Sequence, residues 1–353
     1  MTSSLPLLAA VPLVAGLLSA PATGATATWQ PATESGQRAA KTPVSPSTER
    51  TGKTGTVAAS GMPDVVERAT APTASERKRV LGYWTPRRMA SALPIDRLAK
   101  VTGLLRRLSA AGRGFAPRRS PHGAASRTAG ARWTSGGAVG RTTGRVFLTI
   151  KGSDFVCSAS SVKSANKDLV VTAGHCVKDG TGAWADNWTF VPGYSQGRRP
   201  YGQYTARRMF VAGPWSRQGD DSHDIGMVAV NTSGGEHLGD TVGGQDIAFG
   251  APRGRLASGF GFPADAPYDG EHLVYCAGPL RDDPNGQTGD QGMRCDMTAG
   301  SSGGPWLSGF DASTGRGTIV SVSSFKYSDD RHTMYGPYFG DSAKTLYATA
   351  SAS

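Results

Sequence analysis

The sequence VVTAGHC, residues 170–176, ends an apolar run on a histidine, and GSSGGP, residues 300–305, places a serine among glycines. Between them, SHDIGMVAV, residues 222–230, carries the acid Asp224 ahead of an alternating apolar segment. These stretches offer a base, an orienting carboxylate and a nucleophile in the order His, Asp, Ser, one of the orders found in catalytic triads. Apolar runs of this length are typical of β-strands, so the motifs predict a β-rich fold with chemistry at strand ends.

Ser302 needs a partner to become a nucleophile, because a serine hydroxyl is only weakly acidic at neutral pH. We expect His175 to accept its proton and Asp224 to hold the histidine in the required tautomer. The backbone N–H groups of Gly300 and Ser302 would form the oxyanion hole. Each residue also has a structural interpretation: His175 as a partly buried turn residue, Asp224 as a turn cap, and Ser302 as part of a linker-like loop. Three motifs in order, each beside a strand, favour the catalytic interpretation.

The net charge of +11 suggests a nucleic-acid partner until it is divided by position. Residues 1–140 contain 19 Lys and Arg against 6 Asp and Glu, whereas residues 141–353 contain 19 against 21. The basic excess therefore lies upstream of the motifs, and the part that carries them gives no support to nucleic-acid binding.

The N-terminus has the composition of an export signal. An apolar stretch from about Leu5 to Ala20 is followed by small residues ending in Ala25-Thr26-Ala27, so residues 1–27 are predicted to be a cleaved signal peptide rather than a membrane anchor. We therefore expect a secreted, extracellular protein with no stable membrane association.

Four cysteines agree with export, since disulfides persist in oxidising compartments. Sequence alone allows three pairings. We favour Cys157–Cys176 and Cys276–Cys295, because each pair is 19 positions apart and lies beside one motif. Their spacing does not match a metal-binding pattern, and we expect no metal and no cofactor.

The chain upstream of the motifs is predicted to be a pro-segment, residues 28–130. Residues 28–75 are rich in Thr, Ala, Ser, Gly and Pro and are expected to be disordered. Residues 76–110 are expected to be partly helical, with apolar residues near helical spacing at Leu93, Ile95, Leu98, Val101, Leu105 and Leu108. Such a basic amphipathic helix could lie on a membrane, but we favour docking on the catalytic part.

Residues 131–353 contain short apolar or alternating runs separated by Gly, Asp, Asn and Pro, the pattern of an all-β sandwich or barrel. No long helix is expected in this part, apart from a short one near 341–349. The length suits two barrels, about 133–238 and about 239–353, with the link between Thr232 and Gly244. We expect a monomer whose substrate site lies between the barrels.

VVTAGHC, DIGMVAV and GSSGGPW resemble the signatures of the trypsin-like, chymotrypsin-fold serine peptidases, especially their secreted bacterial branch. CSASSV (157–162) and YWTPRRM (83–89) are also similar to those precursors. The resemblance covers about residues 133–353. It implies two six-stranded antiparallel β-barrels and a serine endopeptidase acting through an acyl-enzyme on protein or peptide substrates, with His175, Asp224 and Ser302 as the triad.

The resemblance also implies a substrate pocket with Asp296 at its floor and Ser321 and Ser323 on a flanking strand. A carboxylate at the floor would favour Lys or Arg substrates, whereas bonding of Asp296 within its own loop would not. Ser301 departs from the animal digestive members, which carry Asp there to pair with a freed N-terminus. Removal of the pro-segment is therefore expected to act by unblocking the cleft.

Two other functions fit parts of the sequence. G-x-S-x-G at 300–304 also matches a secreted esterase or lipase, which needs its acid and histidine after the serine; the downstream candidates are Asp311, Asp329, Asp330 and His332. That fold needs alternating strands and helices, which this half lacks. A non-catalytic binding protein on a protease scaffold is the second alternative.

The acidic stretch 282–292 offers oxygens for Ca²⁺ but lacks a calcium-loop spacing, and we expect a surface loop.

Overall fold

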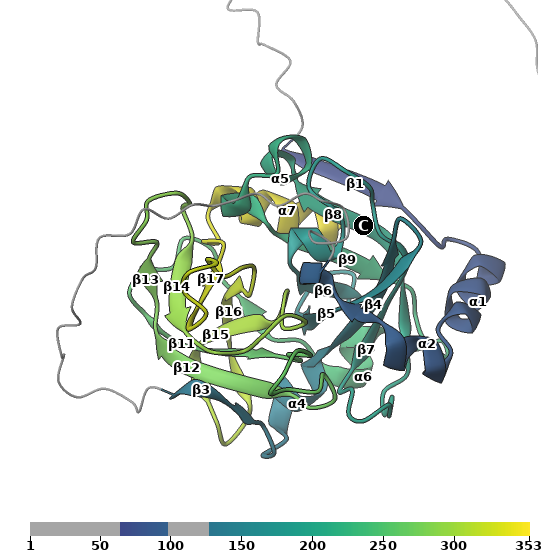
Figure 1. Ribbon diagram of the computed structural model, residues 1–353. Coiled ribbons are helices and arrows are strands. Elements are labelled where there is room, and N and C mark those ends of the chain that lie inside the picture. Colours follow the sequence, from purple (N-terminus) through teal and green to yellow (C-terminus); the bar gives the residue numbers. More distant parts are fainter. Residues whose placement is uncertain (1–63, 98–126) are drawn as a thin grey trace, which may run out of the picture. The chain divides into compact units, whose positions relative to one another are not determined.

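The protein is described by a computed structural model, which covers residues 64–97 and 127–353. The predicted signal peptide, residues 28–63 of the predicted pro-segment and residues 98–126 lie outside the described residues. Figure 1 shows the arrangement of the labelled elements. Within the described ranges, no helix has the length and apolar character needed to cross a membrane.

The first half of residues 131–353 forms a closed six-stranded antiparallel barrel, as expected. The strand order is β8-β7-β4-β5-β6-β9, and β9 pairs back to β8 to complete the ring. The strands are β4 (Thr143–Ile150), β5 (Ser153–Val162), β6 (Leu169–Thr172), β7 (Asp186–Pro192), β8 (Tyr204–Ala212) and β9 (Gly226–Val230).

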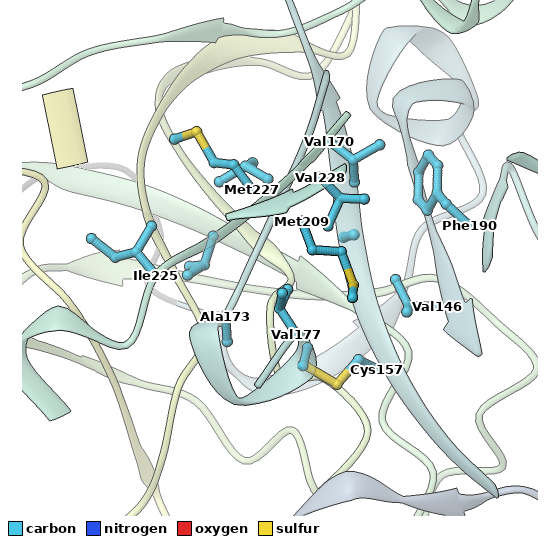
Figure 2. Packing of buried hydrophobic residues seen from close by; sticks show 14 of the residues in the cluster. Val146, Cys157, Val170, Ala173, Val177, Phe190, Met209, Ile225, Met227 and Val228 are labelled. Carbon is cyan, nitrogen blue, oxygen red and sulfur yellow. A yellow bond between two sulfur atoms is a disulfide. The ribbon is translucent and has the colours of Figure 1, made fainter. Parts of the chain in front are cut away.

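The interior of this barrel is apolar on every side. Figure 2 shows one side chain from each strand, all of them fully buried: Val146, Cys157, Val170, Phe190, Met209 and Val228. Burying a side chain of this size contributes about 1.5–3 kcal/mol. The barrel therefore supplies a rigid base for the turns at its strand ends.

The second half, joined by a strand that precedes the first barrel, β3 (Arg127–Arg132), forms two sheets. One has the order β10-β16-β15-β11-β12-β3, and the other has the order β13-β14-β17. The strands are β3 (Arg127–Arg132), β10 (Asp246–Ile247), β11 (Leu256–Gly261), β12 (Val274–Pro279), β13 (Arg281–Asp282), β14 (Gln291–Arg294), β15 (Pro305–Asp311), β16 (Arg316–Val322) and β17 (Thr333–Gly336).

The expected second closed barrel is therefore found as two sheets whose described pairings do not form a ring, and the short β10 runs parallel to β16. The disulfide Cys276–Cys295 links β12 to the residue after β14, and Met293 of β14 packs into the same core cluster. Side-chain packing and a covalent bond thus join the two sheets where a backbone ladder was predicted.

The helices beside the barrel and sheets are short. They are α4 (Gly137–Thr142), α5 (Gly213–Gln218), α6 (Leu238–Val242) and α7 (Asp341–Ser351). The helix expected near 341–349 is confirmed as α7, whose apolar residues Ala343, Leu346 and Ala350 are buried in the same core cluster as the first barrel.

Residues 64–97 pack on the first barrel. They form β1 (Val65–Ala69), α1 (Ala74–Tyr83), α2 (Pro86–Ser91), β2 (Leu93–Pro94) and the 3-10 helix η1 (Ile95–Arg97). β1 extends the barrel sheet antiparallel to β8, and β2 pairs parallel with β5. The predicted disorder is thus wrong for residues 65–69, because Val65 and Val66 pack against the barrel core and the strand hydrogen-bonds to β8.

The amphipathic helix expected from Leu93 is also wrong at its start. Pro94 lacks an N–H and disfavours helical backbone at the residue before it, so Leu93–Pro94 is extended and pairs with β5. The remainder of that predicted helix lies outside the described residues. Helices do occur earlier: α1 begins at a capping box in which Thr73 and Glu76 exchange hydrogen bonds.

This packing explains why β4 is buried along its whole length rather than on alternate residues. Val146 and Leu148 face the barrel core, whereas Phe147 lies in a second cluster with Trp84 and Met89 of the segment 64–97. Residues 64–97 therefore cover a strand face that would otherwise be exposed.

Candidate active site

His175 lies in the 3-10 helix η2 (Gly174–Cys176), which begins two residues after β6 ends. The Cys176 N–H donates to the Ala173 carbonyl at 3.2 Å, and Cys176 is joined to Cys157 of β5. The apolar strand, the tight turn and the disulfide fix the histidine backbone at the rim of the barrel. Both disulfides favoured from the sequence, Cys157–Cys176 and Cys276–Cys295, are present.

Asp224 holds His175 through two bonds. The carboxyl is only 2% exposed and lies between the 3-10 helix η3 (Asp221–His223) and β9. Its Oδ1 accepts from the His175 backbone N–H at 2.7 Å, and its Oδ2 is 2.6 Å from His175 Nδ1. Because a carboxylate only accepts, Nδ1 carries a proton and Nε2 is the nitrogen left for proton transfer.

Ser324 also contacts Asp224, and the sequence analysis did not identify it as a residue of the site. Its hydroxyl donates to Asp224 Oδ2 at 2.5 Å and is buried. The only available signal was its place directly after Ser321-Val322-Ser323, which had been assigned to substrate binding. A hydroxyl beside the carboxylate stabilises the ionised form of Asp224.

The pKa of His175 is shifted strongly upward. Burial acts to lower it, but the charge of Asp224 and its hydrogen bond, followed by the charges of Asp96 and Asp221, raise it to about 9. The imidazole is therefore protonated at neutral pH in this state. Its Nε2 is covered and has no hydrogen-bond partner among the described residues, although 20% of the side chain is exposed.

Ser302 is presented by a loop that glycine makes possible. Gly300 has φ of 96°, and a Cβ there would lie 2.9 Å from the Phe262 carbonyl oxygen. Gly303 has φ of 81°, and a Cβ there would collide with the Ser158 carbonyl. Ser158 also anchors the loop: its N–H donates to the Ser302 carbonyl at 2.8 Å and its hydroxyl to the Gly300 carbonyl at 2.9 Å. The loop conformation is thus fixed before any substrate binds.

Ser301 stands where the animal digestive members carry Asp, and it is held by a neutral hydrogen bond. Its hydroxyl donates to the Thr298 carbonyl at 2.7 Å, and the residue is 1% exposed. The loop is stabilised by this neutral bond, without an ion pair at Ser301.

The contacts of Ser302 itself are unexpected. Its Oγ is 3.3 Å from each carboxylate oxygen of Asp96, a residue of η1 in the segment 64–97. The Gly300 N–H, one of the two predicted oxyanion donors, points to Asp96 Oδ2 at 3.2 Å. The structure therefore brings His175 together with Asp224, and Ser302 together with Asp96, while the bond from Ser302 to His175 Nε2 is not made.

The residues assigned to the substrate pocket have internal partners. Asp296 Oδ1 accepts from Tyr268 Oη at 2.6 Å and from the Gly130 N–H at 2.7 Å. Ser321 and Ser323 are fully buried; the Ser321 hydroxyl donates to the Pro337 carbonyl at 2.9 Å, and Ser323 Oγ accepts from Trp306 Nε1 at 2.9 Å.

The downstream residues of the esterase alternative are engaged in their own turns. The His332 N–H donates to Asp330 Oδ1 at 2.8 Å, and Asp311 accepts from Ser313 and Thr314 in its hairpin. Two buried carboxylates orient imidazoles, Asp224 on His175 and Asp168 on His237, and both pairs precede the serine in the chain.

The acidic stretch 282–292 is not the exposed surface loop that was expected throughout. Asp283 is 8% exposed, and its carboxylate accepts from Tyr327 Oη at 2.7 Å and from Asn285 and Thr288. Asp290 is fully buried. The loop folds these two carboxyls inward.

One group of potential metal-ligand atoms occurs among the described residues: Cys157, His175 and Cys176. Both sulfurs are joined in a disulfide, so neither is a thiolate ligand, and the group does not fit a metal centre.

Comparison with known proteins places these features in context. No family model matches the chain. A curated relative, "Extracellular metalloprotease" of Bacillus subtilis (strain 168), is 34% identical over 100 residues, which are 28% of this chain. The match covers 32% of the relative, so the chain spans about a third of its length.

The solved structures match far more of their own length. The crystal structure of protease Anisep from Arthrobacter nicotinovorans is 43% identical, with a TM-score of 0.58 over 60% of this chain and 96% of that one. A thermostable serine protease, AL20, from an extremophilic microorganism is 40% identical, with a TM-score of 0.58 over 61% and 99%.

A Glu endopeptidase, at 18% identity and a TM-score of 0.52 over 64% of this chain and 97% of that one, shares the fold. The closed barrel carries the histidine and the acid, the glycine-rich loop carries the serine, and two proteases match at 40% identity or more over nearly their whole length. The chain therefore belongs to the chymotrypsin-fold, trypsin-like serine proteases.

Proposed function

We propose that the protein is a serine endopeptidase with His175, Asp224 and Ser302 as its triad. The observation that carries this assignment is the two-point hold of Asp224 on His175, through the backbone N–H and Nδ1. That geometry fixes the imidazole with Nδ1 on the carboxylate and leaves Nε2 as the nitrogen available for proton transfer.

The proposed reaction follows from these positions. With His175 neutral, Nε2 takes the Ser302 proton as Oγ bonds to the carbonyl carbon of the substrate. The oxyanion accepts from the N–H groups of Gly300 and Ser302, and the loss of one such donor costs about 3–4 kcal/mol of transition-state stabilisation. The imidazolium then protonates the leaving amine, and water reverses the sequence on the acyl-enzyme. Asp224 remains ionised throughout.

We further propose that the enzyme is secreted and made as a precursor. Two disulfides support an oxidising compartment, and the packing of residues 64–97 on the first barrel supports a docked pro-segment. Mass spectrometry of the culture supernatant should find a chain that lacks residues 1–27 and has been cut upstream of the peptidase part. Intracellular retention of the full chain would contradict both points.

Two side chains give opposite predictions for specificity. Asp296 favours Lys or Arg at the cleavage site. Lys326, which donates to the carbonyls of Cys295 and Arg331 at 2.6 Å each, favours an acidic residue. Burial lowers the pKa of Lys326 to about 8, while the charges of Asp296, Asp330 and Asp96 act to raise it. Chromogenic peptides with Arg, Glu and Phe separate the two, and Asp296→Asn or Lys326→Met should weaken only the substrate class that each residue binds.

The activity is tested by labelling with a fluorophosphonate probe after limited proteolysis of the full chain. Labelling of the wild type and its absence in Ser302→Ala are expected. The esterase alternative is tested with two histidine variants: His175→Ala should abolish labelling and peptide cleavage, whereas His332→Ala should retain both. The reverse pattern would support the esterase, and no labelling of any form would support the non-catalytic binding protein.

A further inference from the structure

The carboxylate of Asp96 lies against the Gly300 N–H, one of the two donors proposed to bind the oxyanion, and against the Ser302 hydroxyl. Its Oδ2 lies 3.2 Å from the Gly300 nitrogen, and both of its oxygens lie 3.3 Å from Ser302 Oγ. A carboxylate can accept from both groups at once, because its oxygens offer about four lone pairs. The same donors cannot serve a substrate carbonyl while Asp96 is present.

The backbone on both sides holds Asp96 at this place. Leu93 and Pro94 pair with Phe155 and Val156 of β5, and Ile95 is 2% exposed within the core of the first barrel. Asp96 itself is exposed, so its position depends on these neighbours rather than on burial of its own side chain.

The helices upstream add further anchors. Trp84 Nε1 donates to the Asn187 carbonyl at 2.5 Å, and Trp84 is 1% exposed. Tyr83 Oη donates to Asp154 Oδ1 at 2.6 Å, and Arg88 forms an ion pair with Asp154 at 2.9 Å. A segment attached through a strand, a buried tryptophan and an ion pair presents Asp96 in a defined pose.

The raised pKa of His175, the proposed base, also supports an inhibitory role for Asp96. Asp96 is among the charges that raise the pKa of His175, together with Asp224 and Asp221. A protonated imidazole cannot accept the Ser302 proton. The carboxylate thus engages the serine directly, and its charge adds to the larger effect of Asp224 in keeping His175 protonated.

We propose that Asp96 is a built-in inhibitor, whose carboxylate binds the Gly300 N–H and the Ser302 hydroxyl and keeps the precursor inactive until the segment 64–97 leaves. This inference rests on the proposed function. It also accounts for the neutral Ser301: activation by removal of a carboxylate needs no ion pair with a new N-terminus. Cutting the chain after Asp96 replaces an intramolecular contact by an intermolecular one, and the effective concentration of the inhibitor falls.

The test uses the intact full chain and the fluorophosphonate probe, with labelling rates taken before any cleavage is visible by mass spectrometry. Asp96→Ala should label about ten- to a hundredfold faster than wild type, a change of the size that one charge-assisted hydrogen bond contributes. Asp96→Asn, which keeps the shape without the charge, should lie between them. The matched control is Glu67→Gln, which removes an acid of the same segment at an exposed ion pair with Arg208.

A second readout tests the charge of Asp96. The pH midpoint of labelling should fall in both Asp96→Ala and Asp96→Asn, because each removes one of the charges that raise the His175 pKa, and it should stay in place in Glu67→Gln. Equal rates and equal midpoints in wild type, Asp96→Ala and Glu67→Gln would overturn the proposal. If Ser302 is unlabelled in every form, including proteolysed chain, the proposed function itself fails.

Discussion

Asp290 provides the sharpest prediction about stability. It is fully buried, and neither carboxylate oxygen has a hydrogen-bond partner among the described residues. Burial, followed by the charges of Asp224, Asp221, Asp283 and Asp220, raises its pKa to about 8. Asp290→Asn removes the ionisable group while keeping the size of the side chain, so it isolates the cost of this buried acid.

The sign and size of the change in the free energy of unfolding with pH follow from proton linkage. An unfolded Asp ionises near pH 3.8, whereas the folded one keeps its proton to about pH 8, so the folded state binds the extra proton between these values. Stability from this group is present below pH 4 and is lost as pH rises toward 8, at about 1.4 kcal/mol per pH unit. At pH 7 the loss reaches at most about 4 kcal/mol, and relaxation around the carboxyl reduces this to about 2–3 kcal/mol.

The assay is urea unfolding at pH 4, 7 and 9 in a Ser302→Ala background, which prevents self-digestion. We expect Asp290→Asn to match its parent at pH 4 and to exceed it by about 2–3 kcal/mol at pH 7 and above. Asp282→Asn is the control, because Asp282 has a side chain that is 70% exposed and pairs with Arg253 at the surface. Parallel pH profiles for the Asp290 variant and its parent would refute the reasoning.

Three further predictions concern the site and the disulfide. Asp224→Asn should lower kcat about 10³- to 10⁴-fold in processed enzyme, because the orienting carboxylate of His175 is lost; a loss under tenfold would contradict its role. Ser324→Ala should cost about ten- to a hundredfold in kcat/KM, since it removes one bond to a buried carboxylate, and Ser324→Thr should recover part of it. Replacing Cys276 and Cys295 by Ser should lower the free energy of unfolding by about 3 kcal/mol in a denaturant titration, and an unchanged midpoint would show that the link between the two sheets adds nothing.

Much of the site could be predicted from short stretches, because strand, turn and glycine loop are local features. VVTAGHC encodes a buried strand and the turn that bears His175, and GSSGGP encodes the positive φ values that the Ser302 loop adopts. Both disulfides followed from equal spacing. What such patterns do not encode is which distant groups complete the site: Ser324 reaches Asp224 across 100 positions, and Asp290 is buried by packing that its polar neighbours in the sequence do not suggest.

Asp96 shows where local pattern and tertiary structure compete. Leucines and isoleucine at helical spacing predicted a helix from Leu93, but Pro94 and pairing with β5 favour an extended backbone that carries Asp96 to Ser302, 206 positions away. The sequence did contain one feature that sets Asp96 apart from its neighbours. Asp96 is the only acid between residues 77 and 140, within a strongly basic stretch. A solitary carboxylate is unremarkable on a solvated helix, yet it is well suited to accept hydrogen bonds from an oxyanion hole. The charge pattern is what the proposed inhibitory contact requires, because Asp96 is the acid of this segment that reaches Gly300 and Ser302.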